Sequence, residues 1–193
     1  MKKFELTNEF IANRFGTKLF RIRALVEFGD VEAGELGGYV EKESNLGHDD
    51  NAWVYGNARV YGDALVYDNA RVYDNAWVYG DAQVSGDALV YDNARVYGNA
   101  RVCGDAQVSG DARVCGDARV CGNGDYAYAH GFGSVNRTTT FFRLKDGGVG
   151  VRCGCFYGTL AQFRDKIRET HGETKKAQEY LMLADLMKLR FEK

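Results

Sequence analysis

The sequence predicts a mainly β protein, a parallel β-coil built from a six-residue repeat and followed by a small α+β domain. One observation is that residues 52–123 repeat a single phrase twelve times, as in AWVYGN, ARVYGD and ALVYDN. A second is that valine returns at every sixth position from Val54 to Val120. A third is that the flanking segments lack this period, so they form separate units. We therefore expect three parts: an N-terminal cap at 1–39, a repeat coil of about four to five turns at 40–123, and a C-terminal α+β domain at 124–193.

The N-terminal segment carries one clear strand signal. In TKLFRIRAL, which spans residues 17–25, Phe20 and Ile22 alternate with Arg21 and Arg23. This period of two predicts a strand with one buried face. The glycine-dense stretch that follows predicts turns and close backbone approaches.

The coil begins with imperfect rungs. Val40 and Leu46 are six residues apart, and Val54 lies eight residues beyond Leu46. We therefore expect two extra residues to bulge near His48. An atypical first repeat is typical of the end of a stacked array.

Each phrase of the array predicts one strand and one corner. Alanine and valine alternate with two variable residues, as in a short strand, and the closing Gly-Asp, Gly-Asn or Asp-Asn pair tolerates the positive φ of a tight corner. Three strands and three corners close a triangular turn of eighteen residues. We expect alanine and valine to point inward, where each buried valine contributes about 1.5–3 kcal/mol.

The eighteen-residue period arranges outward residues in columns. Three of these columns begin with tyrosine, and tyrosine dominates the first two. The three columns are Tyr55, Tyr73, Tyr91 and Ser109; Tyr61, Tyr79, Tyr97 and Cys115; and Tyr67, Ser85, Cys103 and Cys121. Three further columns run beside them and contain the arginines of the array. These columns are Arg59, Trp77, Arg95 and Arg113; Trp53, Arg71, Leu89 and Gln107; and Leu65, Gln83, Arg101 and Arg119. Aromatic faces of this kind rarely stay in water, so we expect a homotrimer packed through these faces. Base stacking by nucleic acid is the alternative, disfavoured because nine aspartates oppose six arginines in 52–123.

The C-terminal segment predicts two strands and two helices. TTTFFRLKDGGVGVRCGCF indicates a hairpin with its turn at residues 145–148. We expect helices at Thr159–Thr170 and Thr174–Phe191, with Thr159 or Gly158 as the first cap and Gly172 ending the first helix. The expected apolar stripe of the second helix is Leu181, Ala184, Leu186 and Leu189. This unit is expected to cover the open edge of the last turn.

The composition indicates a cellular location for the protein but does not identify its partner. The formal charge is −2, but residues 124–193 carry 12 Lys and Arg against 8 Asp and Glu, a weak indication of an anionic partner. The N-terminus has no apolar run of signal-peptide length, and no segment predicts a membrane span. We therefore expect a cytoplasmic protein whose five cysteines are free thiols. Cys103 and Cys121 stack one turn apart, so a disulfide is sterically conceivable, but a reducing compartment argues against it.

The repeat resembles the hexapeptide-repeat proteins that form left-handed parallel β-helices. The phrase aliphatic-x-Gly-Asx-Ala-x carries this resemblance over residues 40–123. Left-handedness comes from the resemblance alone, because crossover connections are normally right-handed.

Two further stretches carry resemblances. The lead-in from Asp30 to Val40, DVEAGELGGYV, looks like the start of a bacterial hexapeptide subfamily of transferase-like trimers. The tail from Gly133 through Cys153-Gly154-Cys155-Phe156 to Gly172 is similar to a tail of uncharacterised phage and prophage proteins. Neither resemblance implies an established reaction.

Many hexapeptide proteins are acyltransferases, and the resemblance implies a histidine base beside a loop that interrupts the coils. Residues 52–123 contain neither a histidine nor such a loop, and the three histidine ligands of the zinc carbonic anhydrase branch are also absent. His48 and His130 are the candidate bases, with a surface histidine as the favoured interpretation. A metal could in principle be bound by Cys153 and Cys155 together with His130 or His171. We favour a structural role for these cysteines instead. We expect no metal and no cofactor.

The most distinctive polar cluster lies after the array. Its hydroxyl, amide and guanidinium groups suit phosphate or another anion. The expected ligand-binding residues are Ser134, Asn136, Arg137, Thr138, Thr139, Arg143 and Arg152, with Thr140 beside them. An ordinary Thr-rich edge strand is the plainer interpretation.

The sequence favours a non-enzymatic binding or scaffold protein, of phage or prophage origin. One version sequesters a small anionic or nucleotide ligand, as an anti-defence protein would. Another version binds a protein partner. The enzymatic alternative is a CoA-dependent acyltransferase with His48 or His130 as the base.

Overall fold

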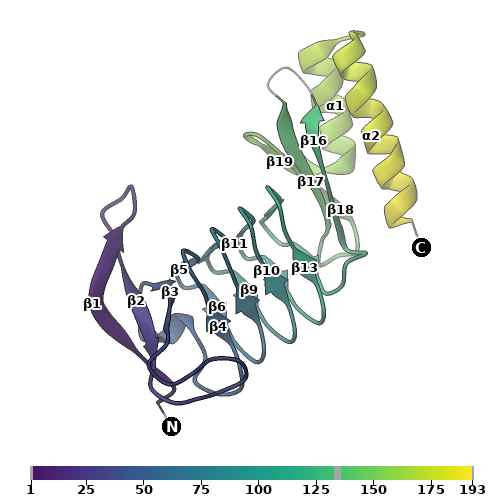
Figure 1. Cartoon of the computed structure of the whole chain (residues 1–193). Coiled ribbons are helices and arrows are strands. Elements are labelled where there is room, and N and C mark those ends of the chain that lie inside the picture. Colours follow the sequence, from purple (N-terminus) through teal and green to yellow (C-terminus); the bar gives the residue numbers. More distant parts are fainter. Residues whose placement is uncertain (1, 133–135, 193) are drawn as a thin grey trace.

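The protein is a row of stacked β-coils with a β-hairpin at one end and an α+β unit at the other (Figure 1). The computed structural model describes residues 2–132 and 136–192. Ser134, one of the expected ligand-binding residues, lies outside the described residues. The predicted class is confirmed, a mainly β protein with a parallel solenoid and a small C-terminal domain of a sheet and two helices.

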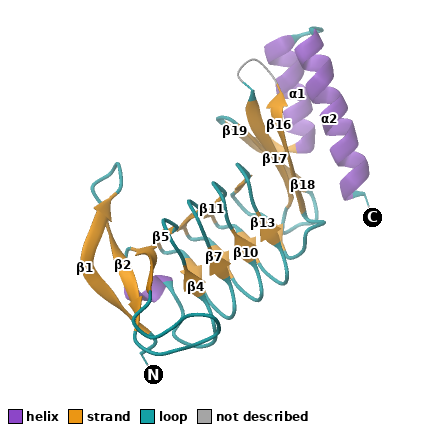
Figure 2. Cartoon of the chain, in the orientation of Figure 1, coloured by secondary structure: helices purple, strands orange, loops and turns teal. Residues whose placement is uncertain are grey.

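The array forms one parallel sheet along each of three sides (Figure 2). Val60 pairs with Val78, and Val78 with Val96, so each turn takes eighteen residues as predicted. The first side contains β5 (Arg59–Gly62), β8 (Trp77–Gly80), β11 (Arg95–Gly98) and β14 (Arg113–Val114). The second contains β4 (Trp53–Val54), β7 (Arg71–Val72), β10 (Leu89–Val90) and β13 (Gln107–Val108), and the third contains β6 (Leu65–Val66), β9 (Gln83–Val84), β12 (Arg101–Val102) and β15 (Arg119–Val120).

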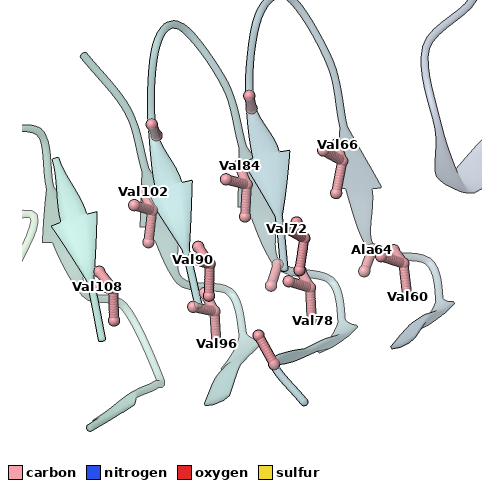
Figure 3. Close-up of a cluster of buried hydrophobic side chains, with 14 of the residues drawn as sticks. Val60, Ala64, Val66, Val72, Val78, Val84, Val90, Val96, Val102 and Val108 are labelled. Carbon is pink, nitrogen blue, oxygen red and sulfur yellow. The ribbon is translucent and has the colours of Figure 1, made fainter. Parts of the chain in front are cut away.

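The core is a ladder of small side chains. Every alanine from Ala52 to Ala118 and every valine from Val54 to Val120 in the repeat is at most 1% exposed. Figure 3 shows valines of successive turns stacked in rows along the coil axis. The inward direction of both residue types is therefore confirmed. Because valine is β-branched, it suits the extended backbone of these two- to four-residue strands.

The corners over residues 56–117 depend on positive φ at the first residue of the closing pair. Gly62, Gly80 and Gly98 have φ of 72°, 73° and 68°, and Asp68 has φ of 57°. A Cβ on Gly80 would lie 3.0 Å from the Gly98 backbone nitrogen of the next turn, so a side chain there would crowd that backbone. The corner chemistry that the sequence indicates is confirmed.

The N-terminal cap extends the first side of the coil. β1 (Phe4–Ala12) and β2 (Lys18–Ala24) are antiparallel, and β2 pairs with β3 (Leu36–Val40), which continues into the parallel sheet through β5. A short 3-10 helix, η1 (Glu43–Asn45), follows. The expected strand at 17–25 is confirmed as β2, whereas β1 was not expected.

The first turn contains the expected insertion. Val40 pairs with Val60 and Leu46 with Val66, a separation of twenty residues where later turns have eighteen. The two extra residues therefore fall between Leu46 and Val54, beside His48. This prediction is confirmed.

Trp53 is fully buried, which corrects its expected place in an outward column. Its ring contacts Phe28 at 5.3 Å and Phe4 at 6.1 Å between ring centres. The cap folds over the first turn and covers that position. Lys3 is buried there as well, and its ammonium donates to the carbonyls of Asp50 and Ala52 at 3.2 and 3.0 Å. Burial lowers the pKa of Lys3 to about 8.

The C-terminal unit is a four-stranded antiparallel sheet with two helices. Its strands are β16 (Tyr126–Phe132), β17 (Arg137–Arg143), β18 (Val149–Cys153) and β19 (Phe156–Thr159). The hairpin of β17 and β18 is confirmed, whereas β16 and β19 were not expected. No helix in the described ranges is long and apolar enough to cross a bilayer.

Both helices begin and end close to the predicted residues. α1 (Leu160–His171) has Thr159 as its N-cap and Gly172 as its C-cap, and α2 (Lys175–Phe191) is capped by Thr174. The predicted apolar stripe of α2 is wrong at two positions, because Leu186 and Leu189 are 56% and 70% exposed. The buried face consists of Ala177, Tyr180, Leu183, Ala184, Met187 and Phe191. That face is buried because it packs against aromatic residues of α1 and the sheet, such as Phe163 and Phe141.

The sheet covers the last turn of the coil, as expected. Ala118 forms a bridge with Leu144, and the Arg113 backbone N–H donates to the Thr140 hydroxyl at 2.9 Å. The Tyr126 hydroxyl donates to the Gln107 carbonyl at 2.6 Å. These contacts satisfy backbone groups that would otherwise form an open edge.

A disulfide joins Cys103 and Cys121, so the expectation of free thiols is wrong for this pair. The residues are eighteen apart, and the coil places their Cα atoms 4.3 Å from each other on neighbouring turns. Cys115 is buried, which corrects its expected outward position. Tyr157 of β19 lies over this part of the coil, since a Cβ on Gly116 would overlap the Tyr157 ring.

Candidate functional site

A cleft of about 480 Å³ lies where the first side of the coil meets the C-terminal sheet. The coil provides one wall and the start of β17 with the β18–β19 turn provides the other. The lining residues are Asn93, Arg95, Asp111, Arg113, Asn136, Arg137, Thr138 and Gly154. The cleft thus joins part of the predicted polar cluster to an arginine column of the array.

The repeat positions two of the arginines. Arg95 of β11 and Arg113 of β14 are paired in register on successive turns. The Arg95 guanidinium carbon lies 4.7 Å from the centre of the Trp77 ring, and that of Arg59 lies 5.0 Å from the same ring. Such cation–π contacts orient a guanidinium without neutralising it. Arg113 is fixed through its backbone by Thr140 of the covering sheet.

Arg137 reaches the cleft from the C-terminal sheet. Its guanidinium lies directly over Gly154, where any Cβ would overlap it. Gly154 also has φ of 58°, which glycine adopts without strain. The adjacent Thr138 hydroxyl is 2.8 Å from His130 Nδ1. The tight turn after β18 therefore makes room for this arginine.

The charge of the cleft is positive. Its lining contains the guanidinium groups of Arg95, Arg113 and Arg137 and the carboxylate of Asp111. Within residues 2–132 and 136–192, no ion pair within 4 Å involves any of these three arginines. Three like charges in one cleft repel each other, so an anion bound there would be stabilised.

The other predicted ligand residues lie elsewhere. Thr139 and Thr140 are buried, and the Thr139 hydroxyl donates to Cys153 Sγ at 3.2 Å. Arg143 lies 3.5 Å from an Asp125 carboxylate oxygen and donates to the Phe191 carbonyl at 3.2 Å, so it connects α2 to the sheet.

Arg152 lies over the tyrosine column, with its guanidinium 6.0 Å from the Tyr97 ring centre. The structure therefore brings Asn136, Arg137 and Thr138 together and places Arg143 and Arg152 outside the cleft lining. The repeat period predicted the column of Arg95 and Arg113 but not its part in a site. Nothing in the sequence showed which side of the coil the C-terminal sheet covers.

His48 is held within the cap. Its Nδ1 accepts from the Lys3 backbone N–H at 3.2 Å, and its Nε2 is 2.9 Å from a Glu43 oxygen. The ring also stacks on Phe4 at 4.5 Å. Both ring nitrogens are occupied, so a structural role accounts for this residue. Among the described residues, no cluster of three or more His, Cys, Asp or Glu side chains has the arrangement of a metal site.

The tyrosine column beside the cleft is closely stacked. Tyr61 and Tyr79 have ring centres 5.0 Å apart, Tyr79 and Tyr97 4.9 Å apart, and both pairs are within 3° of parallel. Burial raises the pKa of Tyr61, Tyr79 and Tyr97. Because the rings cover one another, a nucleic-acid base has no free ring face between them.

The array is similar to a known family of solenoid repeats. The family model described as YdcK beta solenoid repeat matches residues 52–68, 64–80, 82–96, 94–110 and 106–122. No curated protein matches the sequence. The matched residues lie in the coil and include neither terminal unit. The similarity therefore supports a repeat β-solenoid of this type and assigns no activity to the chain.

Proposed function

We propose that this chain is a non-enzymatic binding protein whose cleft holds a small anionic ligand of the nucleotide class. The observation that carries the proposal is the convergence of Arg95, Arg113 and Arg137, without ion-pair partners among the described residues, beside the Asn136 amide and the Thr138 hydroxyl. Guanidinium groups bind phosphate oxygens in a bidentate manner, and several of them recognise a polyanion.

The size and lining of the cleft support a small molecule. Its volume of about 480 Å³ is within the range of ordinary ligand sites. Its guanidinium, amide and hydroxyl groups donate hydrogen bonds that bind and orient phosphate, whereas the Asp111 carboxylate repels an anion and leaves the three arginines in excess. Sequestration of an anionic signal, as in an anti-defence protein, fits this chemistry and the resemblance of the tail to phage and prophage proteins. A cytoplasmic location is part of the same proposal, and it requires that the Cys103–Cys121 disulfide persist in a reducing compartment.

We also propose that the coil is a left-handed hexapeptide β-helix and that three copies assemble through its faces. Support comes from the six-residue period and from tyrosines such as Tyr73 and Tyr91, which stay partly exposed in a single chain. Size-exclusion chromatography with light scattering should give three times the 21.5 kDa chain mass. A monomer at micromolar concentration would contradict the assembly. In that case a scaffold that binds a protein partner through these faces becomes the better hypothesis.

Thermal unfolding with inorganic pyrophosphate or ADP tests the ligand proposal. At a hundred times the dissociation constant, a ligand adds about 2.7 kcal/mol, which raises Tm by about 5–10 °C in a chain of this size. Arg137→Ala should remove the shift. Arg168→Ala is the matched control, because Arg168 is exposed on α1 and lies outside the cleft lining. Absence of any shift at millimolar concentrations of both compounds would refute the proposal.

CoA-dependent acyl transfer is the second candidate, and one contact favours it. His130 is bonded to Thr138, which lines the cleft, so this ring lies next to the site. In this reaction His130 would take a proton from an acceptor hydroxyl or amine, which attacks the acetyl carbonyl of acetyl-CoA, and the thiolate that leaves takes up a proton as free CoA. Release of free CoA thiol in the presence of such an acceptor, lost in His130→Ala and kept in His171→Ala, would replace the binding proposal with an enzymatic one.

A further inference from the structure

A second cavity, of about 290 Å³, lies on the other side of Arg137. It is formed by the β18–β19 turn and the C-terminal half of α1, within the C-terminal unit. Arg137 lines both cavities, whereas Arg95 and Arg113 line only the first. The lining residues of the second cavity therefore differ from those of the cleft, so the two cavities can be tested with different variants.

The floor of this cavity is apolar and firmly packed. Phe156 and Phe163 have ring centres 5.4 Å apart, and Phe163 contacts Tyr180 at 5.8 Å. Phe163, Ile167 and Tyr180 are at most 6% exposed because the helices and the sheet hold them. These packed residues give the floor little freedom to collapse, and the partly exposed Phe156 offers most of its accessible aromatic surface.

The polar atoms of the floor already have partners. The Tyr180 hydroxyl donates to the Phe132 carbonyl at 3.3 Å, and Cys153 Sγ accepts from Thr139. Burial raises the pKa of Tyr180 to about 12, so its hydroxyl stays neutral. A ligand group that enters this cavity therefore gains apolar contact and need not supply hydrogen bonds to the floor.

The rim of the cavity is basic. Arg137, Lys166 and His171 surround it, and no carboxylate is among its described lining residues. Lys166 is paired with Glu169 at 2.9 Å, outside the lining, and no ion pair in the described ranges involves Arg137. An apolar floor under a cationic rim selects a molecule that is aromatic at one end and negatively charged at the other.

We propose that this cavity is a second binding site, specific for a small aromatic anion such as an aryl carboxylate, sulfonate or phosphate. The aromatic ring packs on Phe156 and Phe163, and the negative charge faces Arg137 and Lys166. This site goes beyond the proposed function and does not depend on it, since the described linings of the two cavities share Arg137 alone and the floor shares no residue with the cleft.

The test uses 1-anilinonaphthalene-8-sulfonate, an aromatic anion whose fluorescence rises in apolar sites. The folded full chain should bind one equivalent per chain in a saturable manner. Lys166→Glu should weaken binding at least about tenfold, which is about 1.4 kcal/mol. Arg168→Glu, on the same helix and with the same change in charge, should bind as the wild type does. Equal affinity in the two variants would overturn the proposal.

A second variant separates a loss of binding from a loss of folding. Thr170 is exposed on the rim, so Thr170→Trp should fill the cavity while thermal unfolding stays near that of the wild type. Unchanged fluorescence in Thr170→Trp would also overturn the site. Arg95→Ala separates this site from the cleft, because it should weaken pyrophosphate binding and leave the fluorescent probe bound. Failure of pyrophosphate alone would refute the proposed function and leave this site intact.

Discussion

A single residue at positive φ can determine where an arginine of the cleft lies. Gly154 is the clearest case, because its missing side chain provides the space that the Arg137 guanidinium occupies. The contact is with the far end of a flexible side chain, so the fold can adapt when that space is filled. We therefore expect the site to be more sensitive to this position than the fold.

Gly154→Ala should weaken anion binding about as much as Arg137→Ala does. Its effect on stability should be small, since a non-glycine residue at positive φ costs about 1–2 kcal/mol. Isothermal titration with pyrophosphate and thermal unfolding measure the two effects separately. Gly147→Ala is the matched control, because Gly147 has φ of 86° with no atom within 4 Å of an added Cβ. Equal anion affinity in both variants would show that Gly154 does not position Arg137.

At the scale of elements, the parallel strands convert one repeated tyrosine into a stacked column. Tyr61, Tyr79 and Tyr97 are in register on β5, β8 and β11, so each ring covers part of the next. Burial disfavours the phenolate and raises the pKa of all three tyrosines above their usual value of 10. Ionisation of these hydroxyls therefore costs more free energy in the folded coil than in the unfolded chain.

The free energy of unfolding should fall as the pH rises above about 10. In this range the folded protein holds protons that the unfolded chain releases, so stability decreases by up to about 1.4 kcal/mol per pH unit for each tyrosine. Urea unfolding between pH 8 and 11.5 measures the slope. Tyr79→Phe should have a shallower slope, with little difference from the wild type at pH 8. Identical slopes would mean that the folded environment of Tyr79 does not favour its neutral form.

At the scale of the whole molecule, stability depends on stacking between turns and on the two terminal units. Each turn buries its valines only against the turns before and after it. The cap covers Trp53 at one end, and the C-terminal sheet pairs with the last turn at the other. A defect in a central turn should therefore disrupt the coil on both sides.

Val84→Asp should strongly destabilise the coil, because it places a carboxylate among buried valines of the middle turn. We expect a loss of more than about 4 kcal/mol, measured by urea unfolding, together with loss of any assembled form in size-exclusion chromatography. Gln83→Asp is the control, since Gln83 is the neighbouring residue and points outward. A Val84→Asp chain that unfolds at the wild-type urea concentration would contradict the proposed role of the valine ladder.

The sequence by itself determined the coil and much of its ends. A period of six with fixed alanine and valine is explained only by short strands and corners, so the eighteen-residue turn, the inward residues and the bulge near His48 were all predictable. The helix caps at Thr159 and Thr174 were predictable too, because capping is a local interaction.

Only the tertiary structure decided which outward residues are covered and where a site forms. Trp53 and Cys115 occupy outward positions in the repeat, yet the terminal units bury both. Arg95 and Arg113 belong to a cleft because the C-terminal sheet happens to cover that side of the coil. The period fixes the direction of a side chain relative to the coil axis, but the docking of a non-repetitive unit depends on contacts far apart in the sequence, which no local pattern records.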